Sequence, residues 1–567
     1  MNIKKYLNKA AVFGSLVLIL NSCKVDVVPT DRYTGEVIWT EEKSVELYIN
    51  GMYSEFQTFQ FGQFPIGYSN ATDALSDILK YTSISSGNGT VNILASDASR
   101  VSAATPTLNY WQSAYTRIRR LNEFMDGLDK LSKFDEDKKN KLKAEARYIR
   151  GYVYFWLARI HGSVVILKSI EEYAVKDRQR SSEDDVWNFI ADDFAFASEY
   201  LPETWPAAQR GKATKGAAYG FLARTWLNAA SIAQYDKKQF NSDPLTGVPA
   251  DKAKEYYQNA VNASQKVIDL SNQGLYALAS DFTGIFTNKA SKESIFQIDF
   301  VAPQMTHQYD MGFVPPGDDK ANALVYGVPT AELVDEFEME NGGKFDWNNS
   351  AMRANPYENR EKRFYGTILY NGAEWKGRTI NTTPNDVTEG YVAYGSSAEP
   401  KKTVTGYYVR KMLDESNTNL VMNKSSQSWI EMRYAEIILI NAEAKLGAGD
   451  LEGAKQALNT LRNVREVGNT PAATSIELFD AIKHERMVEL AFEGHRYWDL
   501  RRWRIAHTVL NDRRMTGHKV LPLGSGFTYD VVSADNADRN FTPSLYYFPI
   551  PETEIQRNLE LTQIKGW

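Results

Sequence analysis

The chain has 567 residues, with 65 Lys and Arg against 71 Asp and Glu, 43% hydrophobic residues and a single cysteine. This composition is typical of a globular protein. A formal net charge of −6 argues against a nucleic-acid partner, because such proteins need a basic surface to neutralise phosphates. One cysteine excludes an internal disulfide framework and any CxxC redox motif.

Residues 1–22 have the pattern of a secretory signal peptide. Three lysines precede an apolar run from Ala10 to Leu20, which is too short for a bilayer core that needs about 20 residues. The only cysteine, Cys23, follows directly after a small residue, and this arrangement resembles the lipobox of bacterial lipoproteins. We expect cleavage before Cys23, acylation of that cysteine with chains such as palmitate, and a flexible tether over residues 23–38.

Eight segments of the remaining chain carry the 3.6-residue period of amphipathic helices. They are residues 106–130, 138–161, 183–201, 212–232, 251–271, 431–447, 451–466 and 475–494. Most are neighbours joined by short polar turns, so they form helix pairs. We predict a mainly α fold in which about four tetratricopeptide-like helix pairs, at residues 39–271 and 431–503, form the scaffold of one body that spans residues 39–567.

Local signals mark the ends of several of these helices. Ser182 is a predicted N-cap, and Thr474 with Glu477 forms a predicted capping box. Gly494 is the predicted C-cap of the helix that begins after Thr474.

The pair at residues 436–462 carries the clearest tetratricopeptide pattern. Ala442, Gly449, Ala454 and Leu458 fall where that repeat needs small or apolar residues at the helix crossing. Asp450 is placed to cap the second helix of the pair.

Two stretches lack the helical period and are rich in Gly, Asn, Pro and Tyr. The longer one, residues 272–430, carries only short strand-like runs such as residues 293–300, and the shorter one is residues 67–92. Long loops on a rigid scaffold commonly carry binding residues, so we expect the ligand site in these stretches, mainly in residues 272–430.

Five segments of the chain resemble signature segments of the SusD/RagB family, in the family's order. They are residues 144–162, 359–372, 433–444, 486–503 and 546–567. The resemblance implies a surface-exposed outer-membrane lipoprotein that binds oligosaccharides, or in some branches peptides, beside a SusC-type TonB-dependent transporter for which it forms a lid. It also implies that no reaction is catalysed, that no cofactor is needed and that residues 504–567 form a C-terminal packing tail.

The residues themselves offer no enzyme signature. No GxSxG or HExxH motif is present, and the six histidines are not paired at metal-ligand spacing, so we expect neither catalysis nor a metal site. A dense cluster over residues 495–501 has two interpretations. It is compatible with an active site, but ion pairing of Asp499 with neighbouring arginines at a helix end explains it better.

A glycan site needs aromatic faces for sugar rings and polar side chains for hydroxyl groups. We expect the aromatic faces from Trp375 and Trp347 first, then from Tyr81 and Tyr309. The further candidates in the two loop-rich stretches are Asp73, Asp77, Arg378, Tyr391 and Tyr394. For each ring, burial inside the loop's own core is the competing interpretation. A peptide-binding family member or a tetratricopeptide-type adaptor for another protein is the alternative function.

Overall fold

The computed structural model describes residues 35–57, 71–84, 95, 97, 101–104, 108–236 and 242–567. The predicted signal peptide and Cys23 lie outside these ranges, so both stay predictions. Helix α2 (Gly35–Thr40) begins inside the range predicted as tether. In the described ranges, no helix is both long enough and apolar enough to cross a membrane.

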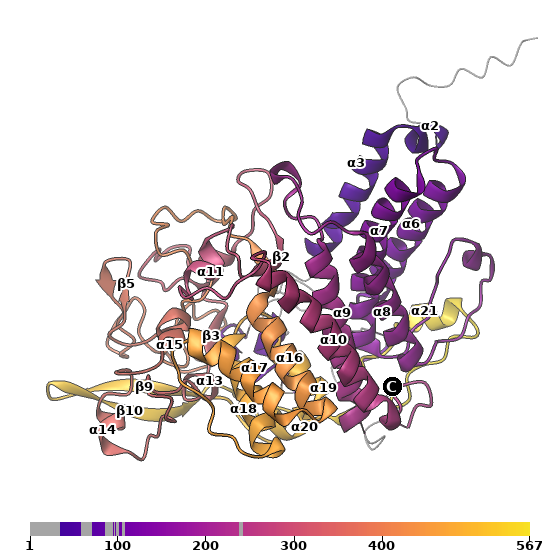
Figure 1. The fold of residues 1–567 in the computed structure, drawn as a ribbon. Helices are drawn as coiled ribbons and strands as arrows, with labels where there is room; N and C mark the ends of the chain where they lie inside the picture. Colours follow the sequence, from indigo (N-terminus) through magenta and orange to yellow (C-terminus); the bar gives the residue numbers. More distant parts are fainter. Residues whose placement is uncertain are drawn as a thin grey trace, which may run out of the picture.

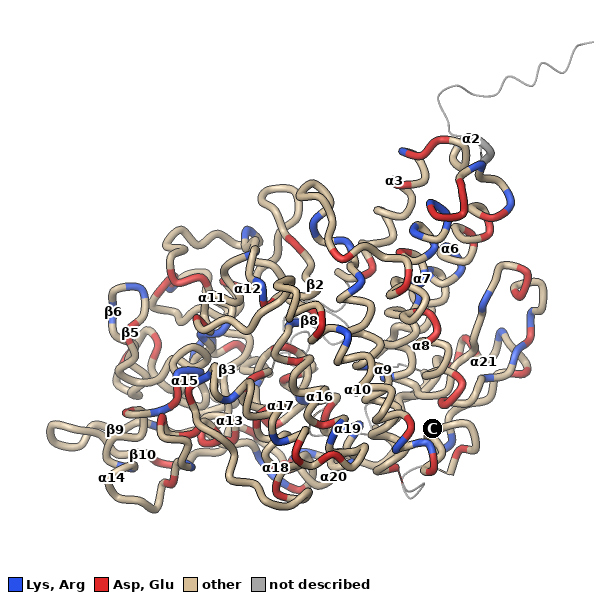
Figure 2. Tube along the Cα trace, viewed as in Figure 1, with Lys and Arg blue, Asp and Glu red and all other residues tan. Residues whose placement is uncertain are grey.

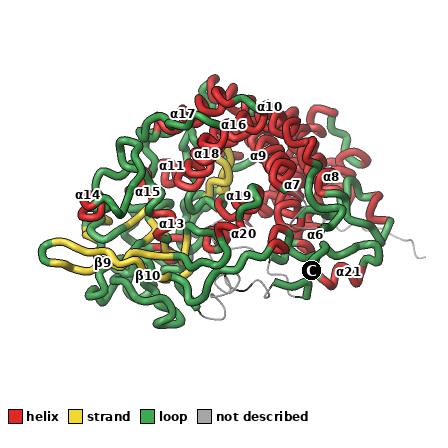
Figure 3. Tube along the Cα trace, turned by 90° about the horizontal axis from the view of Figure 1, so that it is seen from below, coloured by secondary structure: helices red, strands yellow, loops and turns green. Residues whose placement is uncertain are grey.

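A row of long helices forms one half of the molecule, and loops with short strands form the other half (Figure 3). The row comprises α3 (Glu42–Met52), α6 (Trp111–Lys130), α7 (Glu136–His161), α8 (Glu183–Tyr200), α9 (Lys215–Tyr235), α10 (Ala253–Asn272), α16 (Tyr434–Ala448), α17 (Leu451–Val464) and α18 (Ser475–Glu489). From α6 onward each helix packs along the next one (Figure 1). The predicted mainly α architecture of paired helices is confirmed.

Helices α10 and α16 pack against each other, although residues 273–433 separate them in the chain. The loop-rich half is therefore an insertion between two neighbouring helices of the row. Strand β2 (Ser294–Ile298) at the start of the insertion pairs antiparallel with β8 (Trp429–Arg433) at its end. This pairing brings the two ends of the insertion together at the scaffold.

Several predicted caps are present. The side chain of Ser182 accepts a hydrogen bond from the backbone N–H of Asp185, and Thr474 with Glu477 forms the complete capping box of α18. Asp450 caps α17 through the backbone N–H of Gly453 at 2.9 Å. These side chains satisfy backbone N–H groups that have no partner within the helix.

Three predicted helix limits are wrong. The helix expected over residues 106–130 begins only at Trp111. The helix expected over residues 431–447 begins only at Tyr434, because residues 429–433 pair with β2 as a strand. The helix expected to end at Gly494 ends at Glu489. Gly494 adopts a left-handed φ of +77° in the turn that follows, and its N–H bonds to Asp73 at 2.9 Å.

The remaining strands form four further pairs. They are β1 (Leu79–Tyr81) with β3 (Gly327–Pro329), β4 (Ile368–Leu369) with β7 (Tyr408–Val409), β5 (Glu374–Trp375) with β6 (Arg378–Thr379), and β9 (Thr516–Leu523) with β10 (Gly526–Ser533), all antiparallel. The β9–β10 hairpin was not expected in the C-terminal tail. It projects from the loop-rich half (Figure 1).

Short helices occupy the connections. They are α4 (Ala71–Ala74), α11 (Gly284–Thr287), α12 (Tyr309–Phe313), α13 (Ala331–Val334), α14 (Ser350–Ala354), α15 (Lys362–Thr367), α19 (Arg496–Arg502), α20 (Ala506–Val509) and α21 (Glu552–Arg557). The 3₁₀ helices are η1 (Tyr53–Gln57), η4 (Glu171–Ala174), η5 (Ala207–Gln209), η6 (Ala250–Lys252) and η7 (Pro543–Tyr546).

A buried ionic network joins the scaffold to the insertion. The carboxylate of Glu489, at the end of α18, receives Arg433 at 2.7 Å, Arg465 at 2.8 Å and Arg363 at 2.9 Å, and all four side chains are almost fully buried. Figure 2 shows acidic and basic residues interleaved along α17, α18 and the neighbouring α15. Burial alone would raise the pKa of Glu489, but the three guanidinium groups outweigh it and hold the pKa well below its usual value.

We expect Glu489→Gln to lower the free energy of unfolding by on the order of 3 to 5 kcal/mol, because it leaves three buried guanidinium groups without their shared charge. Urea unfolding at pH 7 measures the change. The control is Glu466→Gln, which breaks an exposed pair with Lys362 and should cost less than about 1 kcal/mol. Equal losses in the two variants would contradict this prediction.

The difference in the free energy of unfolding between the native chain and Glu489→Gln should also depend on pH. Because folding lowers the pKa of Glu489, its ionised form stabilises the fold fully above about pH 5. That contribution is lost as the pH falls below the ordinary Glu pKa of about 4.3. The difference between the native chain and Glu489→Gln should therefore narrow in unfolding curves recorded at decreasing pH.

Candidate functional site

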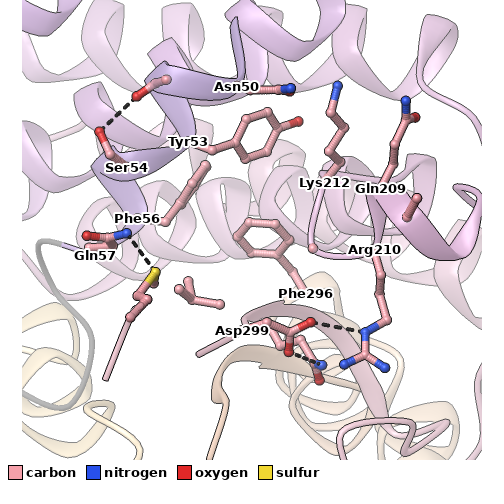
Figure 4. Close-up of a pocket in the computed structure, with 16 residues that line it drawn as sticks. Asn50, Tyr53, Ser54, Phe56, Gln57, Gln209, Arg210, Lys212, Phe296 and Asp299 are labelled. Atoms are coloured by element: carbon pink, nitrogen blue, oxygen red, sulfur yellow. Dashed lines mark hydrogen bonds and ion pairs between the residues drawn. The ribbon is translucent and has the colours of Figure 1, made fainter. Parts of the chain in front are cut away.

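An open cleft of about 390 Å³ lies where the C-terminal end of α3 meets β2 and the connection between α8 and α9. Figure 4 shows Asn50, Tyr53 and Ser54 along one edge and Arg210 with Asp299 along the opposite edge. The volume is in the range of pockets that hold small molecules or a few sugar rings.

Two aromatic rings form the floor of this cleft. Phe56 of η1 and Phe296 of β2 are almost fully buried and meet edge to face, with ring centroids 4.8 Å apart. Both rings also contact Tyr148 on α7, at 5.8 and 5.5 Å between centroids. The floor is therefore fixed to the helical scaffold.

Charged and amide side chains line the rim. Arg210 Nε lies 3.0 Å from Asp299 Oδ2, and Gln297 donates to Asp299 Oδ1 at 2.8 Å. Lys212 Nζ lies 3.0 Å from the buried carboxylate of Glu145, which also accepts the hydroxyl of Tyr53 at 2.9 Å. Burial raises the pKa of Glu145, and Lys212 only partly offsets this effect.

A second cleft of about 380 Å³ shares a wall with the first, formed by residues 210–212 and by Phe296 and Gln297. Its distinctive residue is Trp205, a half-buried ring in the connection between α8 and α9. The indole N–H donates to the carbonyl of Ala213 at 2.7 Å, which fixes the ring.

A third cleft of about 430 Å³ meets the first at Gly51 and Ser54 and extends to α6, where Arg117 and Arg120 line it. The three clefts are therefore neighbours that share lining residues. We call them together the groove. Its described part offers aromatic surface, amides and charged groups, and the described residues include no group of three or more His, Cys, Asp or Glu that could hold a metal ion.

Three of the four leading aromatic candidates are buried, so the prediction that they offer an exposed face is wrong. Trp375 is fully buried, and its indole N–H lies 3.0 and 3.1 Å from the two oxygens of Asp318. Tyr81 is stacked on Tyr326 with centroids 6.0 Å apart. Tyr309 is fully buried and donates to the carbonyl of Lys411 at 3.1 Å.

The fourth candidate, Trp347, is half-buried against the β9–β10 hairpin. Its ring centroid lies 4.4 Å from that of His518 and 5.5 Å from that of Tyr529. Its indole N–H donates to Asp335 at 2.9 Å, and burial, as the largest effect, raises the pKa of Asp335 to about 7. Trp347 lies outside the groove lining.

The two acidic candidates, Asp73 and Asp77, are buried and bind other residues of the protein. Asp77 forms a two-point ion pair with Arg496, both contacts at 2.8 Å. Asp73 is fully buried, and burial raises its pKa to about 7, although the Gly494 N–H lowers it in part. Residues 72–83 are all buried, so this part of the chain does not form the exposed loop that the sequence predicted.

The remaining candidates are half-buried. Arg378 pairs with Asp318 at 2.6 Å and with Glu389 at 2.7 Å. The ring of Tyr394 lies under Lys80 Nζ, 3.8 Å from the ring centroid. Tyr391 is likewise half-buried, and none of these three residues lines the described groove.

The charged cluster at residues 495–501 is structural, as the favoured interpretation predicted. Asp499 binds Arg486 at 2.8 Å and Arg502 at 2.9 Å. Burial lowers the pKa of His495 to about 4, so the imidazole is neutral at pH 7. The ion pairs of Asp499 and the lowered pKa of His495 agree with a structural ion-pair network at this helix end.

Two family models match the chain. The model of the SusD family matches residues 292–567. A model described as starch-binding associating with outer membrane matches residues 33–227. The chain belongs to the SusD/RagB family.

Relatives of known sequence or structure agree with this assignment. A SusD-like protein of Bacteroides fragilis is 26% identical, with a TM-score of 0.77 over 94% of this chain and 98% of that one. A SusD-like carbohydrate binding protein of the same species is 24% identical, with a TM-score of 0.74 over 93% and 100%. SusD-like protein P2 of Formosa agariphila is 24% identical over 80% of this chain and 79% of its own.

The groove residues of this SusD/RagB member were missed in the sequence because they come from separate segments. One signal was present: residues 202–212 place Trp205 between two prolines and just before Arg210 and Lys212, in a connection between predicted helices. A second was the pair Lys289 and Lys292 directly before a predicted strand. Neither of these two signals shows that the segments lie side by side in the folded protein.

We expect Trp375→Ala to lower the free energy of unfolding by about 3 to 5 kcal/mol, because it removes a fully buried ring. Denaturant unfolding followed by circular dichroism measures the loss. Trp205→Ala, which removes a half-buried ring, should cost clearly less. A small loss for Trp375→Ala would show that its loop is not packed as described.

Proposed function

We propose that this protein is a non-catalytic surface lipoprotein of the outer membrane that captures glycan nutrients in the groove. It delivers them to a SusC-type TonB-dependent transporter, over which it acts as a lid. The observation that carries the proposal is a set of neighbouring open clefts, with an aromatic ring and hydrogen-bonding side chains, in a chain of the SusD/RagB family.

The side chains of the groove suit sugar chemistry. The half-exposed ring of Trp205 offers a π-face to the C–H face of a sugar, and Gln57, Gln209 and Asn50 offer amides to hydroxyl groups. Several neighbouring clefts suit the successive sugar units of a polymer better than a single small molecule. The similar Bacteroides fragilis protein that is named as carbohydrate binding supports the same ligand class.

The ion pairing of the carboxylates that line the groove supports capture without cleavage. A glycosidase needs two carboxyl groups about 5 to 10 Å apart on either side of the scissile bond. Of the three acids that line the groove, Asp299 is held by Arg210 and Glu55 is paired with Arg117, which leaves Glu203 as a single carboxylate without an arginine partner among the described residues. Carboxylates occupied by arginine are poorly placed to give or take a proton.

Membrane attachment and delivery follow from the predicted lipid on Cys23 and from the family. The matched model described as associating with outer membrane supports the location. A lid needs higher affinity for the transporter in the loaded state than in the empty state, and glycan bound across the groove supplies such a difference.

Native affinity electrophoresis tests capture directly. The purified protein is run through gels that contain single polysaccharides, with a parallel binding assay for mixed peptides, and the recovered polymer is sized. Retardation by a glycan whose length is unchanged supports the proposal. Binding of peptides alone would support the alternative function, and a shortened polymer would refute the absence of catalysis.

We expect Trp205→Ala to weaken glycan binding about tenfold or more, because stacking on this ring is lost. The dissociation constant from isothermal titration measures the change, and thermal unfolding confirms that the variant is folded. Trp347→Ala is the matched control. Loss of binding in Trp347→Ala alone would place the site at the β9–β10 hairpin.

We expect Cys23→Ala to move the protein from the membrane fraction to the soluble fraction, because the acyl chains supply the attachment. Fractionation and acyl labelling measure this outcome. Co-purification of the native protein in mild detergent should recover a transporter subunit. Unchanged membrane retention of the variant would refute the lipid anchor.

A further inference from the structure

The groove carries more basic than acidic side chains, whereas the whole chain is acidic. In the described lining, the basic residues are Arg117, Arg120, Arg210, Lys212, Lys289 and Lys292, and the acidic residues are Glu55, Glu203 and Asp299. The chain as a whole has 65 basic and 71 acidic residues. The excess is therefore local to the groove.

Ion pairing does not remove this excess. Arg210 pairs with Asp299, and Lys212 pairs with Glu145 behind the wall. Lys289 and Lys292, by contrast, form no ion pair with any described residue. Each donates to a backbone carbonyl, Lys289 to Phe300 at 2.5 Å and Lys292 to Gly274 at 3.1 Å. An ammonium group has three donors, so each lysine keeps donors for a ligand.

Lys289 is partly desolvated and has a second cation nearby. The side chain is half-buried in the second cleft, beside the wall that contains Arg210. Its pKa is lowered mainly by burial, and Arg210 lowers it further against the opposing effect of Asp299. An anion beside this ammonium group would offset the loss of solvation, which is the main cause of the lowered pKa.

We propose, on the basis of the function above, that the groove binds an acidic glycan. Its carboxylate or sulfate groups contact Lys289 and Lys292, while one sugar ring lies on Trp205. All three residues line the second cleft. Charge-assisted hydrogen bonds to an anionic sugar are stronger than those to a neutral hydroxyl group, so they select acidic from neutral glycans.

The test uses polymers that differ only in charge. Polygalacturonate is compared with its fully methyl-esterified form, and dextran sulfate with unsulfated dextran, by affinity electrophoresis of the purified full-length protein. We expect at least one acidic polymer to bind about tenfold or more tightly than its neutralised partner, and this preference should shrink in 0.5 M salt. The two pairs distinguish carboxylate from sulfate as the group that is bound.

Variants of the two lysines test which side chains bind the anionic groups of the polymer. Lys289→Gln and Lys292→Gln should each reduce the preference for the acidic polymer several-fold, and Lys292→Arg should retain most of it. Lys254→Gln is the control, since it removes the same charge from the exposed face of α10. Equal binding of each acidic polymer and its neutral partner would overturn this inference and leave glycan capture intact. Failure of all glycans to bind would refute both.

Discussion

The buried charge of Glu489 is the constraint on which the arrangement of the two halves depends. One carboxylate at the end of α18 is shared by Arg433 at the junction of β8 and α16, by Arg465 after α17 and by Arg363 on α15. Arg433 and Arg465 also reach Glu293, directly before β2. Because removing any charged member leaves others buried and unpaired, the network admits one relative placement of these segments.

This placement explains where the groove lies. The insertion leaves the scaffold after α10 and returns at β8, and the β2–β8 pairing holds its two ends together. One side of β2 therefore faces the end of α3 and the connection between α8 and α9, and Phe296 meets Phe56 there. The groove is a consequence of inserting a loop-rich segment between two packed helices, and it forms at the joint between the halves.

The sequence predicts the scaffold well and the groove poorly, for a physical reason. Helical periodicity and capping are local, so they locate α7, α8 and α18 and even the cap at Thr474. Whether an aromatic ring is exposed, by contrast, depends on residues that are far away in the sequence. Trp375 is buried against another segment, whose Asp318 accepts the indole N–H. Nothing in the residues around Trp375 indicates this contact. The groove likewise requires several segments, distant in the sequence, that meet only after folding.

The groove is also preorganised, which bears on how a lid can work. Its floor rings pack on Tyr148 of α7, and Trp205 is fixed by its bond to the carbonyl of Ala213. A ligand that enters therefore orders few protein side chains, so little binding energy is lost to conformational entropy. A site built on rigid elements also gives a loaded protein that moves as one body. If the proposed transporter partnership holds, such a groove can bind glycan without rearranging its own floor.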